Sequence, residues 1–288
     1  MRTTMQTMTI EAHCKVNFTL EVLGKRADGY HALRSVVIPV SLSDTLEIEP
    51  TDGEISSDTG FPDDLCVKAA KVVLGEDSKR GARIHVAKRI PAGGGLGGGS
   101  ADAAATLVAL NEIYALGLSP AQLAEKGALV GSDVPALVLS RFAGAVLMEG
   151  RGEFVSPLGV DLPHLDLVLV NPGVFSSTPA VFRACSPRVT NDNEILYNIR
   201  VSLKSGDAAA IAESLQNDLE APAMKLHPEI AHAKSALQKA GAEGVTMSGS
   251  GSTVFGIAKS GEEADLIAAK LKSLGYGAWH VTTVCPVV

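Results

Sequence analysis

The sequence predicts an α+β fold of two domains, and three observations support this prediction. The 288 residues are 46% hydrophobic and 20% charged, with a net charge of −7, which indicates a folded chain with ample material for a core. Strand-like and helix-like segments are mixed without the strict alternation of a doubly wound sheet. A segment rich in glycine and proline, residues 150–163, predicts a boundary between domains 1–155 and 156–288.

The amino-terminal third is expected to be rich in strands. Residues 14–22 place Val16, Phe18, Leu20 and Val22 at alternate positions, which is the period of a half-buried strand. Residues 45–48 and 83–90 show the same pattern. Pro91 and a run of glycines then end regular structure.

Helices are expected after this run. Ser100 is expected to cap a helix that continues to about residue 116. Ser119, Pro120 and Gln122 form the pattern of a capping box, and that helix should end near Gly131. Beyond the boundary we expect strands at residues 165–170, 253–258 and 279–284, and helices from residue 178 and at 208–217, 229–240 and 262–274.

Composition narrows the functional class. The acidic charge balance argues against a nucleic-acid partner bound through bulk charge, and no apolar stretch approaches the ~20 residues of a membrane span. The four cysteines are scattered and form no CxxC pair, which favours a reduced, intracellular protein. The first ten residues lack the apolar region of a secretory signal, so we expect a cytoplasmic location.

The glycine run is the most informative segment. Six of the 29 glycines fall within positions 93–99, in the sequence PAGGGLGGGS of residues 91–100. Glycines allow backbone N–H groups to approach a phosphate, and the start of the following helix adds its positive dipole end. The run therefore predicts an anion site between a strand and a helix.

Three other interpretations of the run are weaker. A structural turn needs one or two glycines rather than six, and a Walker A loop needs Lys-Ser/Thr after its last glycine, where this chain has Ser-Ala. Gly93, Gly95 and Gly98 match the GxGxxG pattern of nicotinamide dehydrogenases. Such enzymes require an acidic residue ending a strand about 20 residues further on. Here that region begins a helix.

Several polar residues outside the run remain open between a functional and a structural role. Asp133 could be a general base or a helix cap, because it follows Gly131 at the start of a helical turn. Lys15 could be a paired, inward-facing lysine or an exposed lysine at a sheet edge. Asn17 lies two residues further along the strand and should face the same side as Lys15.

A second group has equally open interpretations. Tyr30 and His31 follow an Asp-Gly turn and could bind a planar heterocycle, or be a packed tyrosine beside a surface histidine. Residues 249–253 could form a second functional loop or a tight turn. Lys88 and Arg89 could face a nucleotide or be solvated.

The motifs together resemble the GHMP kinases, the superfamily of galactokinase, homoserine, mevalonate and phosphomevalonate kinases. PAGGGLGGGSADAAATL is similar to the loop that binds the ATP phosphates in that superfamily. The blocks KVN, GKRADGYH, GSDVP, NPG and SGSGST follow in the family's order and resemble members that phosphorylate the 2-hydroxyl of a cytidine-diphosphate-linked methylerythritol, a step towards isoprenoid precursors. The matching blocks extend from about residue 12 to residue 256.

This resemblance implies a role for each site residue. Asp133 would be the catalytic base, and Lys15 would pair with it and with the acceptor hydroxyl. Asn17 would bind substrate or aspartate, and Tyr30 and His31 would hold the cytosine. Phe182 would stack on the other cytosine face, and Thr178 would lie near the ribose or diphosphate. The residues implied to bind the ATP phosphates are Pro91, Ala92, Gly93, Gly94, Gly95, Leu96, Gly97, Gly98, Gly99, Ser100 and Ala101.

The same resemblance implies an ATP-dependent small-molecule kinase of two domains with its active site in the cleft between them. Mg²⁺ would be carried by the nucleotide, without a protein metal site, and the oligomeric state stays open. Three alternatives remain: a GHMP kinase for homoserine or mevalonate, a nicotinamide dehydrogenase, and a silent nucleotide-binding regulator, which would be expected to lack Lys15 or Asp133. The chain departs from the usual family pattern at His13, Cys14 and Ala101.

Overall fold

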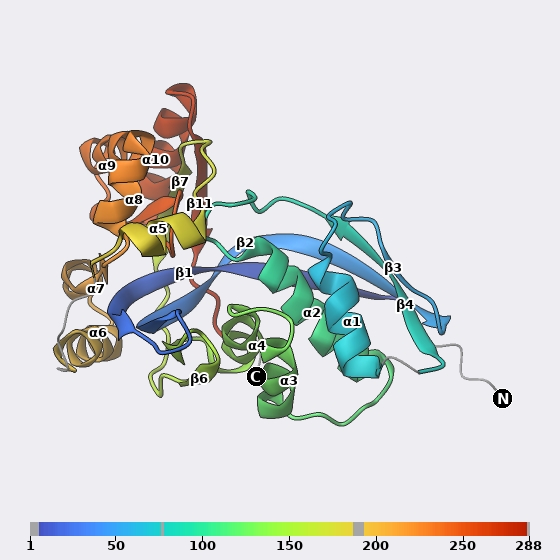
Figure 1. Cartoon of the computed structure of the whole chain (residues 1–288). Helices are drawn as coiled ribbons and strands as arrows, with labels where there is room; N and C mark the ends of the chain where they lie inside the picture. The colour runs from blue at the N-terminus through green and yellow to red at the C-terminus, as the bar shows by residue number, and fades with distance from the viewer. Residues whose placement is uncertain (1–5, 76–77, 187–192, 287–288) are drawn as a thin grey trace.

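The computed structural model describes residues 6–75, 78–186 and 193–286, which form two sheets with helices packed on them (Figure 1). The larger sheet has the strand order β3-β4-β2-β1-β8, and β5 pairs with both β2 and β6. Its strands are β1 (Met8–Lys25), β2 (His31–Asp52), β3 (Ile55–Ser57), β4 (Arg80–Ala87), β5 (Val146–Gly150), β6 (Phe154–Pro157) and β8 (Gln216–Asn217).

Strands β1 and β2 form one long antiparallel hairpin, which Figure 1 shows as two long, curved blue ribbons. The predicted strand at 14–22 lies inside β1, but only residues 45–48 of β2 were predicted. The alternating pattern is lost over residues 33–40, where nearly all side chains are buried and Pro39 interrupts the run. Pro39 pairs with Lys15 at a register shift of β1, a place where a missing N–H is tolerated.

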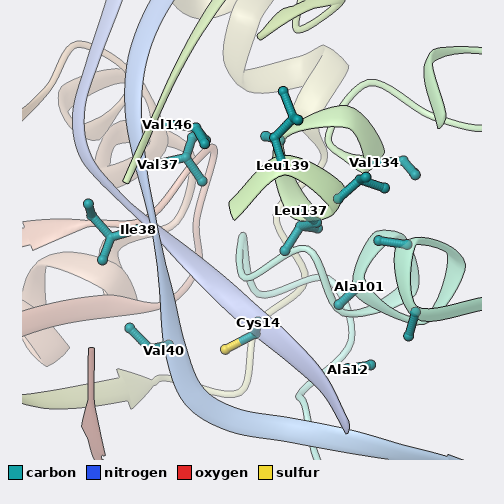
Figure 2. Close-up of a cluster of buried hydrophobic side chains, with 14 of the residues drawn as sticks. Ala12, Cys14, Val37, Ile38, Val40, Ala101, Val134, Leu137, Leu139 and Val146 are labelled. Carbon is teal, nitrogen blue, oxygen red and sulfur yellow. The ribbon is translucent and has the colours of Figure 1, made fainter. Parts of the chain in front are cut away.

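Four helices described after β3 belong to this part of the molecule. Helix α2 packs on β1 and β2 and contacts α1 and α4. Figure 2 shows the interior between them, where Cys14 lies among apolar residues that include Ile38, Ala101 and Leu137. These helices are α1 (Leu65–Leu74), α2 (Gly98–Ile113), α3 (Pro120–Ala128) and α4 (Val134–Ala143).

The helix starts in this region show one wrong and one confirmed prediction. Ser100 is not the cap of α2, since the helix begins at Gly98 and its cap is Gly97, at a φ of +71°. The glycine run therefore enters the helix itself, because glycine adopts the left-handed conformation without a side-chain clash. The capping box of α3 is confirmed: the Gln122 N–H donates to Ser119 Oγ at 3.3 Å, and the Ser119 N–H donates to Gln122 Oε1 at 2.9 Å.

The smaller sheet has the antiparallel order β11-β7-β10-β9. Of its strands β7 (Asp166–Asn171), β9 (Glu243–Met247), β10 (Val254–Ala258) and β11 (Gly277–Thr282), all but β9 were predicted. The predicted helices correspond to α5 (Thr178–Ala184), α7 (Ala208–Ser214), α9 (Pro228–Ala240) and α10 (Gly261–Ser273). Helices α6 (Glu194–Ser205) and α8 (Glu220–Leu226) were missed, as were α1, α4, β3, β5, β6 and β8. Residues 216–217 of β8 fell within the helix predicted at 208–217, which ends at Ser214.

The two sheets are joined through a shared core. Phe18 of β1 stacks on Phe255 of β10, with ring centroids 5.9 Å apart. Strand β8 comes from the carboxy-terminal half of the chain but pairs with β1 in the larger sheet. The division at residues 155 and 156 therefore stays a prediction. Within the described ranges, no helix combines the length and apolar character needed to cross a membrane.

Candidate active site

The two glycine-rich loops pack directly against each other. The Thr253 N–H donates to the Gly94 carbonyl at 3.1 Å, and the Ser248 hydroxyl donates to the Gly95 carbonyl at 3.0 Å. A Cβ on Gly95 would lie only 2.2 Å from the Ser248 carbonyl oxygen, so this contact requires glycine. Residues 249–252 do form a tight turn, in which the Gly251 N–H donates to the Ser248 carbonyl at 3.0 Å, and this turn packs on the glycine run and lines the same cleft.

A cleft of about 720 Å³ opens beside these loops. It is lined by both loops, by residues 59–66 before and at the start of α1, and by residues 175–179 before and at the start of α5. Leu96 and Ala101 of the predicted phosphate loop are buried and are not among the residues that line the cleft. The predicted site residues that line the cleft are Lys15, Asn17, Pro91, Ala92, Gly93, Gly94, Gly95, Gly97, Gly98, Gly99, Ser100, Asp133, Thr178 and Phe182.

Lys15 is one of the most buried charged groups of the cleft. It is 3% exposed, and its ammonium donates to Asn17 Oδ1 at 2.7 Å and to the Gly95 carbonyl at 2.9 Å. Its main-chain N–H donates to the Leu96 carbonyl at 3.1 Å, which attaches the glycine loop to β1. The interpretation of Lys15 as an exposed edge lysine is therefore wrong.

Asp133 faces this lysine across the cleft. Its Oδ2 lies 3.6 Å from Lys15 Nζ, and its side chain is 34% exposed. Asp133 occupies the cap position of α4, but its side chain makes no capping hydrogen bond, so the interpretation as a mere cap is also wrong. The Asp133 carboxylate therefore lies at the amino-terminal end of α4 and beside the Lys15 ammonium.

The residues implied to bind cytosine are only partly brought together. The His31 and Phe182 rings stack with centroids 5.4 Å apart and an interplanar angle of 27°. Tyr30 is 56% exposed and lies beneath the Arg151 guanidinium at 5.3 Å. Neither Tyr30 nor His31 is among the described residues that line the cleft. Thr178 Oγ1 lies 2.7 Å from Ser250 Oγ, which connects α5 to the second glycine loop.

Lys88 and Arg89 have different surroundings, although they are neighbours in the sequence. Lys88 lines the cleft, and its ammonium lies 2.5 Å from Asp44 Oδ2 and 2.6 Å from Asp102 Oδ2. Arg89 points away from the cleft and donates to the Ser43 carbonyl at 2.8 Å. Burial would lower the pKa of Lys88, but hydrogen bonds to the two carboxylates outweigh it and raise that pKa.

Sequence reasoning missed Asp44, Asp102 and Phe175. Asp102 lies in the first turn of α2, and its burial raises its pKa to about 7 against the opposing effect of Lys88. Phe175 lines the cleft with its ring against Gly93. A signal existed for Asp102, as an aspartate two residues after the glycine run. Asp44 offered none, because its contact with Lys88 spans 44 residues.

Cys14 is buried in the core rather than beside the lysine ammonium, as its strand phase predicts (Figure 2). Burial raises the pKa of its thiol. Across the described parts of the chain, no three His, Cys, Asp or Glu side chains are grouped so that they could hold a metal ion.

A glycine-rich loop at a helix start, beside a Lys–Asp pair in a cleft, is the arrangement expected of a small-molecule kinase of the GHMP type. Sequence models of the GHMP kinases N terminal domain and the GHMP kinases C terminal domain match residues 64–141 and 199–277. The chain belongs to the GHMP kinases and, within them, to the family of 4-diphosphocytidyl-2-C-methyl-D-erythritol kinases.

Two relatives of that name illustrate the similarity. The protein from Moorella thermoacetica is 41% identical over 280 residues, covering 93% of this chain and 96% of its own. The protein from Pelotomaculum thermopropionicum is 42% identical over 273 residues, covering 92% and 94%.

Solved structures agree with this assignment. A crystal structure of 4-(cytidine 5'-diphospho)-2C-methyl-D-erythritol kinase has a TM-score of 0.82 and 34% identity, covering 96% of this chain and 99% of its own. Homoserine kinase from Cytophaga hutchinsonii shares the fold, with a TM-score of 0.74 at 20% identity and coverage of 97% and 95%.

Proposed function

We propose that this chain transfers the γ-phosphoryl group of ATP to the 2-hydroxyl of 4-(cytidine 5′-diphospho)-2-C-methyl-D-erythritol, in the non-mevalonate route to isoprenoid precursors. The names of its relatives support the substrate. The observation that supports the chemistry most directly is the Lys15–Asp133 pair, 3.6 Å apart, in a cleft lined by both glycine loops. We further propose a cytoplasmic location, without nucleic-acid or membrane partners, and a domain boundary at residues 155 and 156.

Asp133 is proposed to accept the proton of the acceptor hydroxyl as the oxygen attacks phosphorus. A positioned base of this kind contributes a factor of ~10²–10⁴ to the rate. Lys15 offsets the negative charge that develops on the alkoxide, and its contacts with Asn17 and the Gly95 carbonyl hold its ammonium towards the aspartate. No covalent intermediate is needed, because phosphoryl transfer depends on positioning and on charge stabilisation.

The glycine loop fits a triphosphate. Gly97 and the first three residues of α2, 98–100, line the cleft, and no side chain caps the first turn of that helix. The backbone N–H groups of the loop and the dipole of α2 would hold the phosphates. ATP, with Mg²⁺ carried on its phosphates, supplies the transferred group.

His31, Phe182, Tyr30 and Thr178 are proposed to select the cytidine diphosphate. The stacked rings of His31 and Phe182 offer an aromatic surface next to an imidazole that can donate or accept a hydrogen bond. Homoserine and mevalonate contain no heterocycle that could stack on such a surface. This argument favours the cytidine substrate over both.

The direct test compares ATP consumption with the cytidine substrate, homoserine and mevalonate. We expect turnover with the first alone, and faster turnover with either of the others would sink the substrate assignment. Asp133→Asn should lower kcat by ~10²-fold or more while ATP still binds. Asp161→Asn is the matched control, because Asp161 is exposed and outside the cleft lining. Retained activity in Asp133→Asn would remove Asp133 as the base.

A further inference from the structure

A buried ionic cluster joins the chain segments on either side of the glycine loop. Lys88 lies three residues before the loop of residues 91–101, and Asp102 lies directly after it in the first turn of α2. The Lys88 ammonium lies 2.6 Å from Asp102 Oδ2 and 2.5 Å from Oδ2 of Asp44, which belongs to β2. We call these three side chains the clasp.

Asp44 fixes the segment that leads into the loop. Its side chain is fully buried and accepts hydrogen bonds from the main-chain N–H groups of Arg89 and Ile90, the latter at 2.8 Å. The same carboxylate holds Lys88, and Lys88 in turn holds Asp102. The two ends of residues 91–101 are thereby tied to β2 and to each other.

The clasp opens onto the cleft. Lys88 and Asp102 both line it, and the Lys88 side chain is 30% exposed. A Cβ on Gly98, the first residue of α2, would lie 3.7 Å from Lys88 Nζ, so the ammonium is beside the helix start where the phosphates are proposed to bind. Oδ1 of Asp102 is buried and has no hydrogen-bond partner within the described ranges. A cluster that served packing alone would not need to border the ligand.

A loop with six glycines is flexible, so fixing its two ends helps to order it before the nucleotide binds. Glycine loses more conformational freedom on ordering than any other residue, and that entropy is lost at binding unless the loop is already ordered. Fixing both ends shortens the free segment and keeps its N–H groups aimed at one point. Pre-ordering of this kind strengthens binding, because less freedom is lost when the ligand arrives.

We propose that Lys88 and Asp102 are positioning residues, which together with their anchor Asp44 hold the phosphate loop in place for nucleotide binding. The inference rests on the proposed function only in taking ATP as the nucleotide. It assigns the clasp to binding rather than to proton transfer, since Lys15 and Asp133 are the groups proposed for that step.

Calorimetric binding of AMPPNP, a non-hydrolysable ATP analogue, tests the clasp without any acceptor substrate. Lys88→Met and Asp102→Ala should each raise the dissociation constant roughly tenfold. Asp102→Asn, which still accepts a hydrogen bond from Lys88, should restore the dissociation constant to within about threefold of the wild type. Arg89→Met is the matched control, because it removes the neighbouring cation that faces away from the cleft, and it should leave binding unchanged.

Steady-state kinetics supply the second readout. In Lys88→Met and Asp102→Ala, KM for ATP should rise, while kcat at saturating ATP stays within about threefold and KM for the acceptor is unchanged. Unchanged AMPPNP binding in either variant overturns the proposal. An equal loss of AMPPNP affinity in Arg89→Met also overturns it, as does an equal rise in KM for ATP and KM for the acceptor. A wild type that binds AMPPNP but does not phosphorylate the cytidine substrate refutes the proposed function and leaves the clasp standing.

Discussion

Gly95→Ala should separate the two glycine loops, and the structure allows its cost to be worked out. Gly95 has a φ of +76°, where an alanine costs ~1–2 kcal/mol. The new Cβ would also lie 2.2 Å from the Ser248 carbonyl oxygen and 3.0 Å from the Gly251 carbonyl oxygen, neither of which is a flexible side chain. Overpacking of this kind costs ~1–3 kcal/mol, so the total loss should be ~2–5 kcal/mol.

Gly173→Ala provides the matched control. Gly173 has nearly the same φ, +78°, but a Cβ there would meet no atom within 4 Å. Its replacement should cost only the backbone contribution of ~1–2 kcal/mol. Urea unfolding of both variants measures the difference, which isolates the contact between the loops.

Activity gives an independent measure of the same change. The Gly95 carbonyl accepts hydrogen bonds from Lys15 Nζ at 2.9 Å and from the Ser248 hydroxyl. A displaced Gly95 therefore moves the lysine proposed to stabilise the alkoxide, and kcat/KM should fall roughly tenfold or more. Equal unfolding free energies for Gly95→Ala and Gly173→Ala, together with full activity of Gly95→Ala, would refute the reasoning.

Two further predictions concern groups outside the cleft. His280 Nε2 and Nδ1 each lie 2.9 Å from a carboxylate, of Asp166 and Asp265, and although burial lowers its pKa these hydrogen bonds raise it overall. The stabilising effect of the His280 imidazolium is therefore complete below about pH 6.5 and is lost as pH rises through the raised pKa. In urea unfolding, the difference in unfolding free energy between wild type and His280→Gln should narrow from pH 6 to pH 8, and a constant difference contradicts this. Iodoacetamide should label exposed Cys285 in the native protein and buried Cys14 only after unfolding, as mass spectrometry of peptides would show; native labelling of Cys14 would exclude its burial.

Features written in short stretches of sequence could be predicted. In the capping box of α3, the side chains of Ser119 and Gln122 accept hydrogen bonds from each other's main-chain N–H groups. All partners lie within four residues, so these two residues predict the helix start without tertiary information. The glycine run likewise predicts a conformationally permissive backbone without tertiary information. The pairing of Lys15 with Asp133 came from the resemblance, because 118 positions separate the two residues and no local pattern connects them.

Features that depend on distant contacts were missed or misplaced. Strand β2 is buried on both sides around Val36 and Val37, so its sequence lacks the alternation of a half-buried strand. Ser100 is a good capping residue by type, yet Gly97 ends the loop first, because its left-handed conformation lets α2 begin inside the run. Asp44 and Lys88 meet only because β2 and β4 are neighbours in the sheet.

The glycines of the run look alike in sequence but have different physical reasons to be glycine. Gly95 allows the second loop to approach, and Gly97 adopts a left-handed conformation that starts α2. A Cβ on Gly99 would make only an ordinary contact at 3.6 Å with Leu65, so neither reason applies there. The proposed phosphate site offers a reason for glycine there, because a bare backbone lets a phosphate approach closely. Loop docking and helix initiation therefore account for Gly95 and Gly97, independently of the phosphate binding proposed for the run.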